Sequence, residues 1–166
     1  MKALLSLFSS LFLISCSGQS SLKKEIVLAT YRTECQTLEN GTIARVRRTT
    51  PDREVLKPQI KLDATTDRKI SYHIQGHIKT GGHAIRRVKK VETEEQQSGH
   101  ILIIKHTVIV KSFAGKEGNN VYAENYADTF SKSLKTGIKT VKIELYEKNE
   151  KSEQQAQLKT ENIFEL

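Results

Sequence analysis

The chain has 166 residues, of which 28% are charged and 37% are hydrophobic, and its formal net charge is +8. This length is sufficient for one domain with a core of its own. After the first 15 residues no apolar run is long enough to cross a membrane as a helix, which argues against an integral membrane domain. The excess of lysine and arginine indicates either contact with anionic partners or only a solvated surface.

Residues 1–15 have the pattern of a secretory signal peptide. A positive start, Met1-Lys2, precedes an apolar run from Ala3 to Ile14 that is too short for a transmembrane helix. The run ends in Leu13-Ile14-Ser15-Cys16, which resembles the lipobox of bacterial lipoproteins. The resemblance implies that Cys16 receives a diacylglycerol, that the chain is cut before Cys16, and that the new amino group is acylated. The alternative is a plain signal peptide with an incidental cysteine.

Residues 16–24 are small and polar, as a lipidated flexible tether would be. A random coil of this length keeps the following domain within roughly 15–20 Å of the bilayer. The signal is very short, and Ser17 stands where inner-membrane lipoproteins commonly carry Asp. We therefore expect a lipoprotein of the Gram-negative outer membrane, with a covalent lipid on Cys16 and no cofactor.

The first expected strands form a hairpin. Residues 26–31 are β-branched and aromatic, and Asn40-Gly41 is a tight-turn signal before a second run at 42–46. Residues 56–62 alternate between apolar and polar, but Pro58 has no N–H for a ladder. That strand is therefore expected at a sheet edge or at a bulge.

The clearest strand is 69–79, where apolar and polar residues alternate over five consecutive pairs. Thr80-Gly81-Gly82 predicts a hairpin turn into a partner strand at 83–91, with a bulge near Arg86-Arg87. Residues 100–111 are apolar on both parities, which favours a central strand. The segment 121–134 has aromatic residues four apart, as a helix would, but its neighbours favour a strand.

An alternating strand is also expected at 141–145, and the polar segment 149–166 adds at most one edge strand. The core is predicted to come from the apolar parity of these strands: Ile70, Tyr72, Ile74, Ile78, Leu102, Ile104, Val108, Val141, Ile143 and Leu145. His106 shares this parity and is expected as a hydrogen-bonded, partly buried histidine. Cys35 has no partner for an intramolecular disulfide after lipidation of Cys16, so a buried, small apolar role is expected, with an intermolecular disulfide or a reactive thiol as the alternative.

About seven or eight short strands separated by turns predict an all-β protein, an antiparallel β-sandwich over residues 25–148, with a lipocalin-like barrel as the alternative. The section from Tyr72 to Glu147, with its Ile-x-Gly-x-Ile-x-x-Gly-Gly-His hairpin and a late Leu-x-x-Gly-x-x-x-Val-x-Ile strand, resembles immunoglobulin-like or fibronectin-type sandwiches of envelope lipoproteins. The Cys-Trp-Cys signature of antibody domains is missing, since the chain has no Trp.

A basic cluster on the expected 69–91 hairpin is the strongest candidate for partner binding: Lys79, Arg86, Arg87, Lys89 and Lys90. It would contact an anionic lipid, a glycan or an envelope protein. The alternative is an edge strand that charge protects from pairing. Nucleic acid is excluded as a partner, because interleaved aromatic residues are missing and the compartment is wrong.

Histidines supply a weaker candidate, a metal site from His73, His77 and His83. The last two would be diagonal neighbours across the hairpin, but no third ligand can be placed with them. No motif for a catalytic nucleophile, paired carboxylates or a phosphate loop is present, so no catalytic residue is predicted. The sequence favours a membrane-anchored, non-catalytic binding or assembly module over a metal-binding protein or an enzyme without recognisable motifs.

Overall fold

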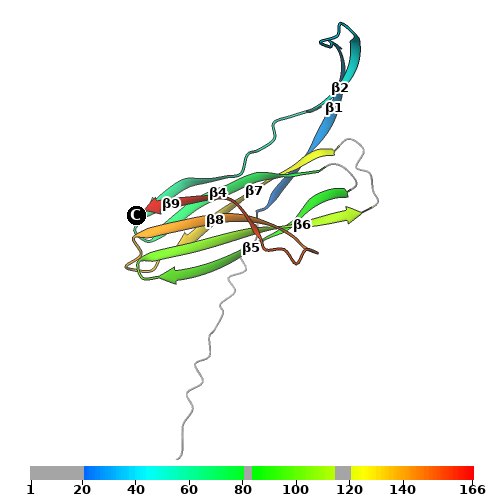
Figure 1. Ribbon diagram of the computed structural model, residues 1–166. Coiled ribbons are helices and arrows are strands. Elements are labelled where there is room, and N and C mark those ends of the chain that lie inside the picture. Colours follow the sequence, from blue (N-terminus) through cyan, green and yellow to red (C-terminus); the bar gives the residue numbers. More distant parts are fainter. Residues whose placement is uncertain (1–20, 81–83, 115–120) are drawn as a thin grey trace, which may run out of the picture.

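The computed structural model describes residues 21–80, 84–114 and 121–166 and shows a sandwich of two β-sheets (Figure 1). The described residues form nine strands: β1 (Lys23–Thr37), β2 (Ile43–Pro51), β3 (Gln59–Thr66), β4 (Lys69–Lys79), β5 (Ala84–Ser98), β6 (Ile101–Ala114), β7 (Val121–Ser133), β8 (Thr140–Asn149) and β9 (Gln157–Glu165). One sheet has the order β2-β1-β7-β4-β3 and the other β5-β6-β8-β9. The predicted all-β sandwich is confirmed. In this part of the chain no helix is long and apolar enough to cross a membrane.

Strand boundaries differ from expectation inside the domain and at its two ends: β1 continues to Thr37 and β5 to Ser98, beyond the expected 26–31 and 83–91. β1 begins at Lys23, so the last two residues of the expected tether belong to the sheet. The C-terminal segment supplies β9, which pairs antiparallel with β8 at the edge of its sheet. The segment 121–134 is a strand, β7, and β3 lies at an edge, directly after Pro58.

The predicted hairpin between residues 69–79 and 83–91 is wrong. β4 pairs with β3 and β7, whereas β5 pairs with β6 in the opposite sheet. A turn signal shows that the chain reverses, but it does not distinguish a hairpin within one sheet from a crossing between two sheets. Gly81, Gly82 and His83 of this connection lie outside the described residues. The bulge expected nearby is present in β5, between Val88 and Lys90.

One strand pair is parallel, β6 with β8, while the other pairs are antiparallel. The chain leaves β6, crosses to the other sheet as β7 and returns as β8. Two reversals restore the original direction, so β8 lies beside β6 with the same orientation. This parallel pair departs from the all-antiparallel expectation.

The core lies between the two sheets and contains all ten residues predicted for it. In β4 the residues of one parity are buried while His73 and His77 point to the outer face, as the alternation indicates. Gly76 lies on the inner face against Tyr126, where an added Cβ would be 2.5 Å from the tyrosine hydroxyl. Close approach of this aromatic ring therefore requires glycine at position 76.

A polar bridge joins the sheets inside this apolar core. The Tyr72 hydroxyl in β4 lies 2.8 Å from Nε2 of His106 in β6, and Oγ1 of Thr93 in β5 lies 2.9 Å from its Nδ1. The Phe130 ring packs against His106 in a tilted orientation, at 4.1 Å between centroids. His106 is fully buried, and burial lowers its pKa to about 4. A neutral imidazole is both donor and acceptor, so His106 has a partner at each ring nitrogen.

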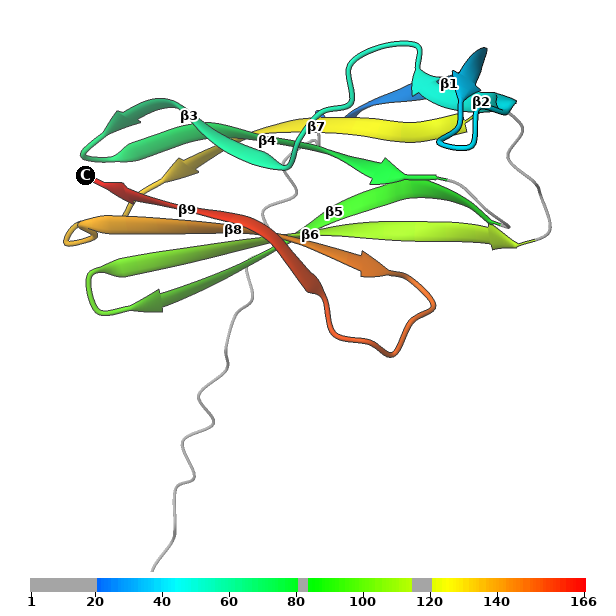
Figure 2. The same cartoon turned by 45° about the horizontal axis from the view of Figure 1, so that its top comes forward.

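A strap, residues 52–58, crosses the outer face of the first sheet from β2 at one edge to β3 at the other (Figure 2). Asn125 in β7 binds this strap as a second backbone would. Its Oδ1 accepts a hydrogen bond from the Leu56 amide at 3.0 Å, and its Nδ2 donates to the Glu54 carbonyl at 2.9 Å. Nδ1 of His77 lies 2.6 Å from the Leu56 carbonyl oxygen. The strap is therefore fixed to the sheet by side chains of β4 and β7.

Candidate interaction surface

The sequence-predicted site residues are not brought together into one site. Cys16 and His83 lie outside the described residues. Nδ1 of His73 lies 2.7 Å from an Asp63 carboxylate oxygen, and His77 is bonded to the strap. Within residues 21–80, 84–114 and 121–166, no group of three His, Cys, Asp or Glu side chains is placed to hold a metal ion.

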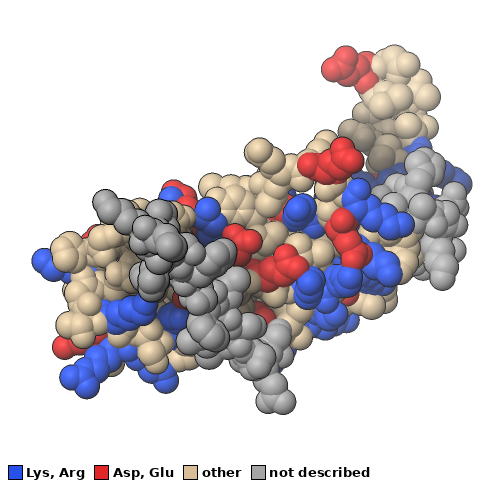
Figure 3. Space-filling view, turned by 90° about the horizontal axis from the view of Figure 1, so that it is seen from below, with Lys and Arg blue, Asp and Glu red and all other residues tan. Residues whose placement is uncertain are grey.

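The basic cluster is largely neutralised where it stands. Four of its five cations face a carboxylate each: Arg86 with Glu147, Arg87 with Glu124 at 3.8 Å, Lys89 with Glu150, and Lys90 with Glu92 at 2.6 Å. The hydrogen bond from Lys89 holds the pKa of Glu150 below its usual value. On the face shown in Figure 3 cationic and anionic side chains are interspersed. This arrangement weakens the field available to an anionic partner.

A feature that the sequence does not reveal is an arm that projects from the sandwich (Figures 1 and 2). β1 changes partner along its length: Lys23–Leu28 pairs with β7, and Ala29–Thr37 pairs with β2 alone. We call the paired stretch 29–51, with its turn, the arm. The turn has Gly41 at φ 80°, and the Asn40 side chain accepts a hydrogen bond from the Thr42 amide.

The composition of the arm differs from that of the remaining chain. It contains four of the eight arginines of the protein, Arg32, Arg45, Arg47 and Arg48, and no lysine, although the chain has nineteen lysines. Exposed apolar side chains accompany these arginines, among them Tyr31, Leu38 and Ile43, which is 69% exposed. Arginine and tyrosine are enriched in protein interfaces and lysine is depleted there. This contrast is the sequence signal from which the arm could have been suspected.

Cys35 lies on the arm and is exposed, so its expected burial is wrong. Cys35 is exposed because the arm has two strands only: within the described residues no other strand flanks 29–37 and 43–51. The register places Cys35 opposite Arg45. Alternation along both strands puts Tyr31, Arg45 and Arg47 on the same face.

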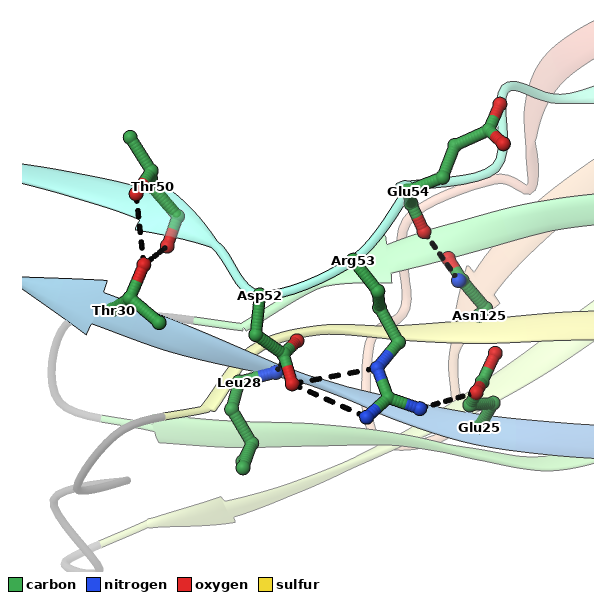
Figure 4. A network of polar contacts seen from close by, with 8 residues as sticks. All are labelled: Glu25, Leu28, Thr30, Thr50, Asp52, Arg53, Glu54 and Asn125. Carbon is green, nitrogen blue, oxygen red and sulfur yellow. Dashed lines mark hydrogen bonds and ion pairs between the residues drawn. The ribbon is translucent and has the colours of Figure 1, made fainter.

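The base of the arm is fixed to the sandwich by a polar network (Figure 4). The Asp52 amide donates to the Leu28 carbonyl at 2.9 Å, and an Asp52 carboxylate oxygen accepts from the Leu28 amide at 2.8 Å. Arg53 bridges Asp52 and Glu25. Desolvation raises the pKa of Asp52, but hydrogen bonds from Arg53 and Leu28 outweigh it and hold the pKa below its usual value. The arm therefore leaves the domain from a defined base.

Comparisons with protein-family models, with curated proteins and with solved structures gave no match for this chain.

Proposed function

We propose that the protein is a non-catalytic binding or assembly module of a Gram-negative outer membrane, anchored by a lipid on Cys16, and that its arm contacts an anionic partner. The anchor rests on the sequence pattern Leu13-Ile14-Ser15-Cys16. The observation that carries the binding role is the arm, an arginine-rich ribbon that lies outside both layers of the sandwich.

The unneutralised charge of the arm supports this assignment over the basic cluster. Arg48 forms an ion pair with Glu34 at 3.1 Å, whereas Arg32, Arg45 and Arg47 have no carboxylate partner among the described residues. Arg32 also stands directly opposite Arg48 in the register. Like charges facing one another across a ribbon are destabilising. An anionic partner would remove this repulsion.

The anchor is tested by fractionation. Wild-type protein should partition with membranes and into detergent, whereas Cys16→Ser should be unprocessed or released from them, because its side chain offers no thiol for the lipid. A density gradient then separates inner from outer membranes. Wild-type protein that stays soluble without detergent would contradict the anchor.

The binding role is tested by removing the arm. Residues 29–51 can be replaced by an Asn-Gly turn that joins Leu28 to Asp52, since the Asp52 amide already donates to the Leu28 carbonyl, as a two-residue turn requires. This variant should unfold like the wild type in urea but should lose the partner that wild type retains from solubilised envelopes. The matched control is Arg86→Glu with Arg87→Glu, which alters the basic cluster and leaves the arm intact. If the armless variant retains the partner and this control loses it, the arm is not the binding surface.

A further inference from the structure

Among the described residues no strand pairs with the outer edge of β2, so this edge of the arm offers free backbone groups. We propose that the partner binds by strand addition: an extended acidic segment of another protein pairs with the free edge of β2, and carboxylates at alternate positions of that segment meet Arg45 and Arg47. This inference rests on the proposed function, since it takes the arm as the contact surface.

The hydrogen bonds at the two ends of the arm show which backbone groups are free. At the tip the Leu38 amide donates to the Thr42 carbonyl at 2.8 Å, and at the base the Asp52 amide donates to the Leu28 carbonyl at 2.9 Å. Bonded and non-bonded pairs alternate along an antiparallel ladder. Even-numbered residues therefore bond across the arm, and the odd-numbered residues of β2 before Pro51 direct their N–H and C=O groups toward the free edge. These residues are Ile43, Arg45, Arg47 and Thr49.

The side chains beside this edge have the charge and order that an acidic strand needs. Arg45 and Arg47 are two residues apart on one face, so their spacing along the strand is about 7 Å and equals that of alternate residues in a neighbouring strand. The guanidinium carbon of Arg47 lies 3.9 Å from the centroid of the Tyr31 ring. Stacking of this kind limits the rotamers of Arg47 and leaves its N–H groups available for bidentate contact with a carboxylate.

An isolated ribbon gains stability from a third strand. Two strands alone are marginal in water, and the cross-strand contacts of the arm are few: Thr30 with Thr50, Glu34 with Arg48, and Tyr31 with Arg47. A protein segment satisfies both the free backbone groups of β2 and its arginines. Lipid phosphates would meet the arginines but would leave the backbone edge unpaired. The observations therefore favour a protein segment over a membrane surface.

The test uses two capped synthetic peptides of nine residues, the length of β2, with identical composition and charge. In one peptide glutamate alternates with threonine, and in the other the glutamates form one block. Vesicles containing an anionic phospholipid serve as the second probe. The protein is the full chain in detergent, and binding is followed by titration and by amide hydrogen exchange.

Strand addition predicts that the alternating peptide binds at least about tenfold more tightly than the block peptide, and that Arg45→Glu with Arg47→Glu weakens it at least about tenfold. Bound peptide should slow exchange of the Arg45, Arg47 and Thr49 amides. Thr49→Pro removes one outward N–H without altering charge and should also abolish binding. Its matched control, Thr33→Pro, removes an N–H from the opposite edge of the arm and should leave binding intact.

Four results would overturn the inference. If both peptides bind equally and amide exchange is not slowed, the arm attracts them by charge alone. If neither peptide binds, the arginines are better explained as protection of the β2 edge against pairing. If Thr33→Pro abolishes binding and Thr49→Pro does not, the peptide pairs with β1 and not with β2. Vesicle binding that depends on Arg45 and Arg47, without peptide binding, would make the occupant a lipid surface. Each of these failures leaves the armless-variant experiment to decide the proposed function separately.

Discussion

Protonation of His106 should destabilise the sandwich as the pH falls below about 6.5, the ordinary pKa of histidine in an unfolded chain. Burial lowers the pKa of His106 in the folded protein to about 4. Between these two values the unfolded chain binds the proton and the folded protein does not, so stability is fully present above about pH 6.5 and is lost toward pH 4. The two pKa values correspond to a loss of about 2 kcal/mol between pH 7.5 and pH 5, and of about 3 kcal/mol in total.

The assay is urea unfolding of wild type and His106→Gln at a series of pH values from 7.5 to 5. Glutamine cannot titrate, but it retains a donor and an acceptor for Tyr72 and Thr93. The variant should be less stable than wild type at pH 7.5. Between pH 7.5 and pH 5, however, its free energy of unfolding should fall by about 2 kcal/mol less than that of wild type. Parallel pH profiles for the two proteins would refute burial of a neutral His106 as the cause.

Three further comparisons test the packing described above, each by urea unfolding. Gly76→Ala places a Cβ against Tyr126 and should cost about 1–3 kcal/mol, so wild-type stability would contradict this close approach. Asn125→Ala leaves two strap backbone groups without their partner and should cost about 1–3 kcal/mol, and a neutral result would mean that the strap is not held there. Ile74→Ala should lower the free energy of unfolding by about 2–5 kcal/mol, because Ile74 is buried. Ile43→Ala on the exposed arm should stay within about 0.5 kcal/mol of wild type. Similar costs for the two variants would contradict the burial of Ile74 and the exposure of Ile43.

Local patterns predicted the strands because burial imposes their period. The alternation in β4 identified Ile70, Tyr72, Ile74 and Ile78 as core, since one face of that strand packs against the other sheet. Asn40-Gly41 likewise located a tight turn, because the left-handed conformation at Gly41 is accessible to glycine at little cost. These features depend on neighbouring residues alone.

The pairing of strands that are far apart in the sequence is harder to predict from local residue patterns. The reversal between β4 and β5 is encoded locally, but the sheet that β5 joins depends on distant contacts, such as the bond from the Val88 amide to Glu124 in β7. Similarly, β1 is one continuous strand whose partner changes after Leu28, and its residue pattern does not mark the change. Cys35 was therefore expected in a core that does not reach the arm. For the same reason the sequence predicts the basic cluster, and not the arm, as the interaction surface.

The proposed contact between the arm and a partner at the membrane can be tested by site-specific photocrosslinking in intact cells. A photocrosslinking amino acid would be placed at Ile43, an exposed residue of the arm, or, as the matched control, at Glu153, an exposed residue between β8 and β9. We predict one discrete crosslinked product in the membrane fraction from position 43 and none from position 153, because the proposed contact is made by the arm. A product from position 153 but not from position 43, or none from either position, would contradict this contact.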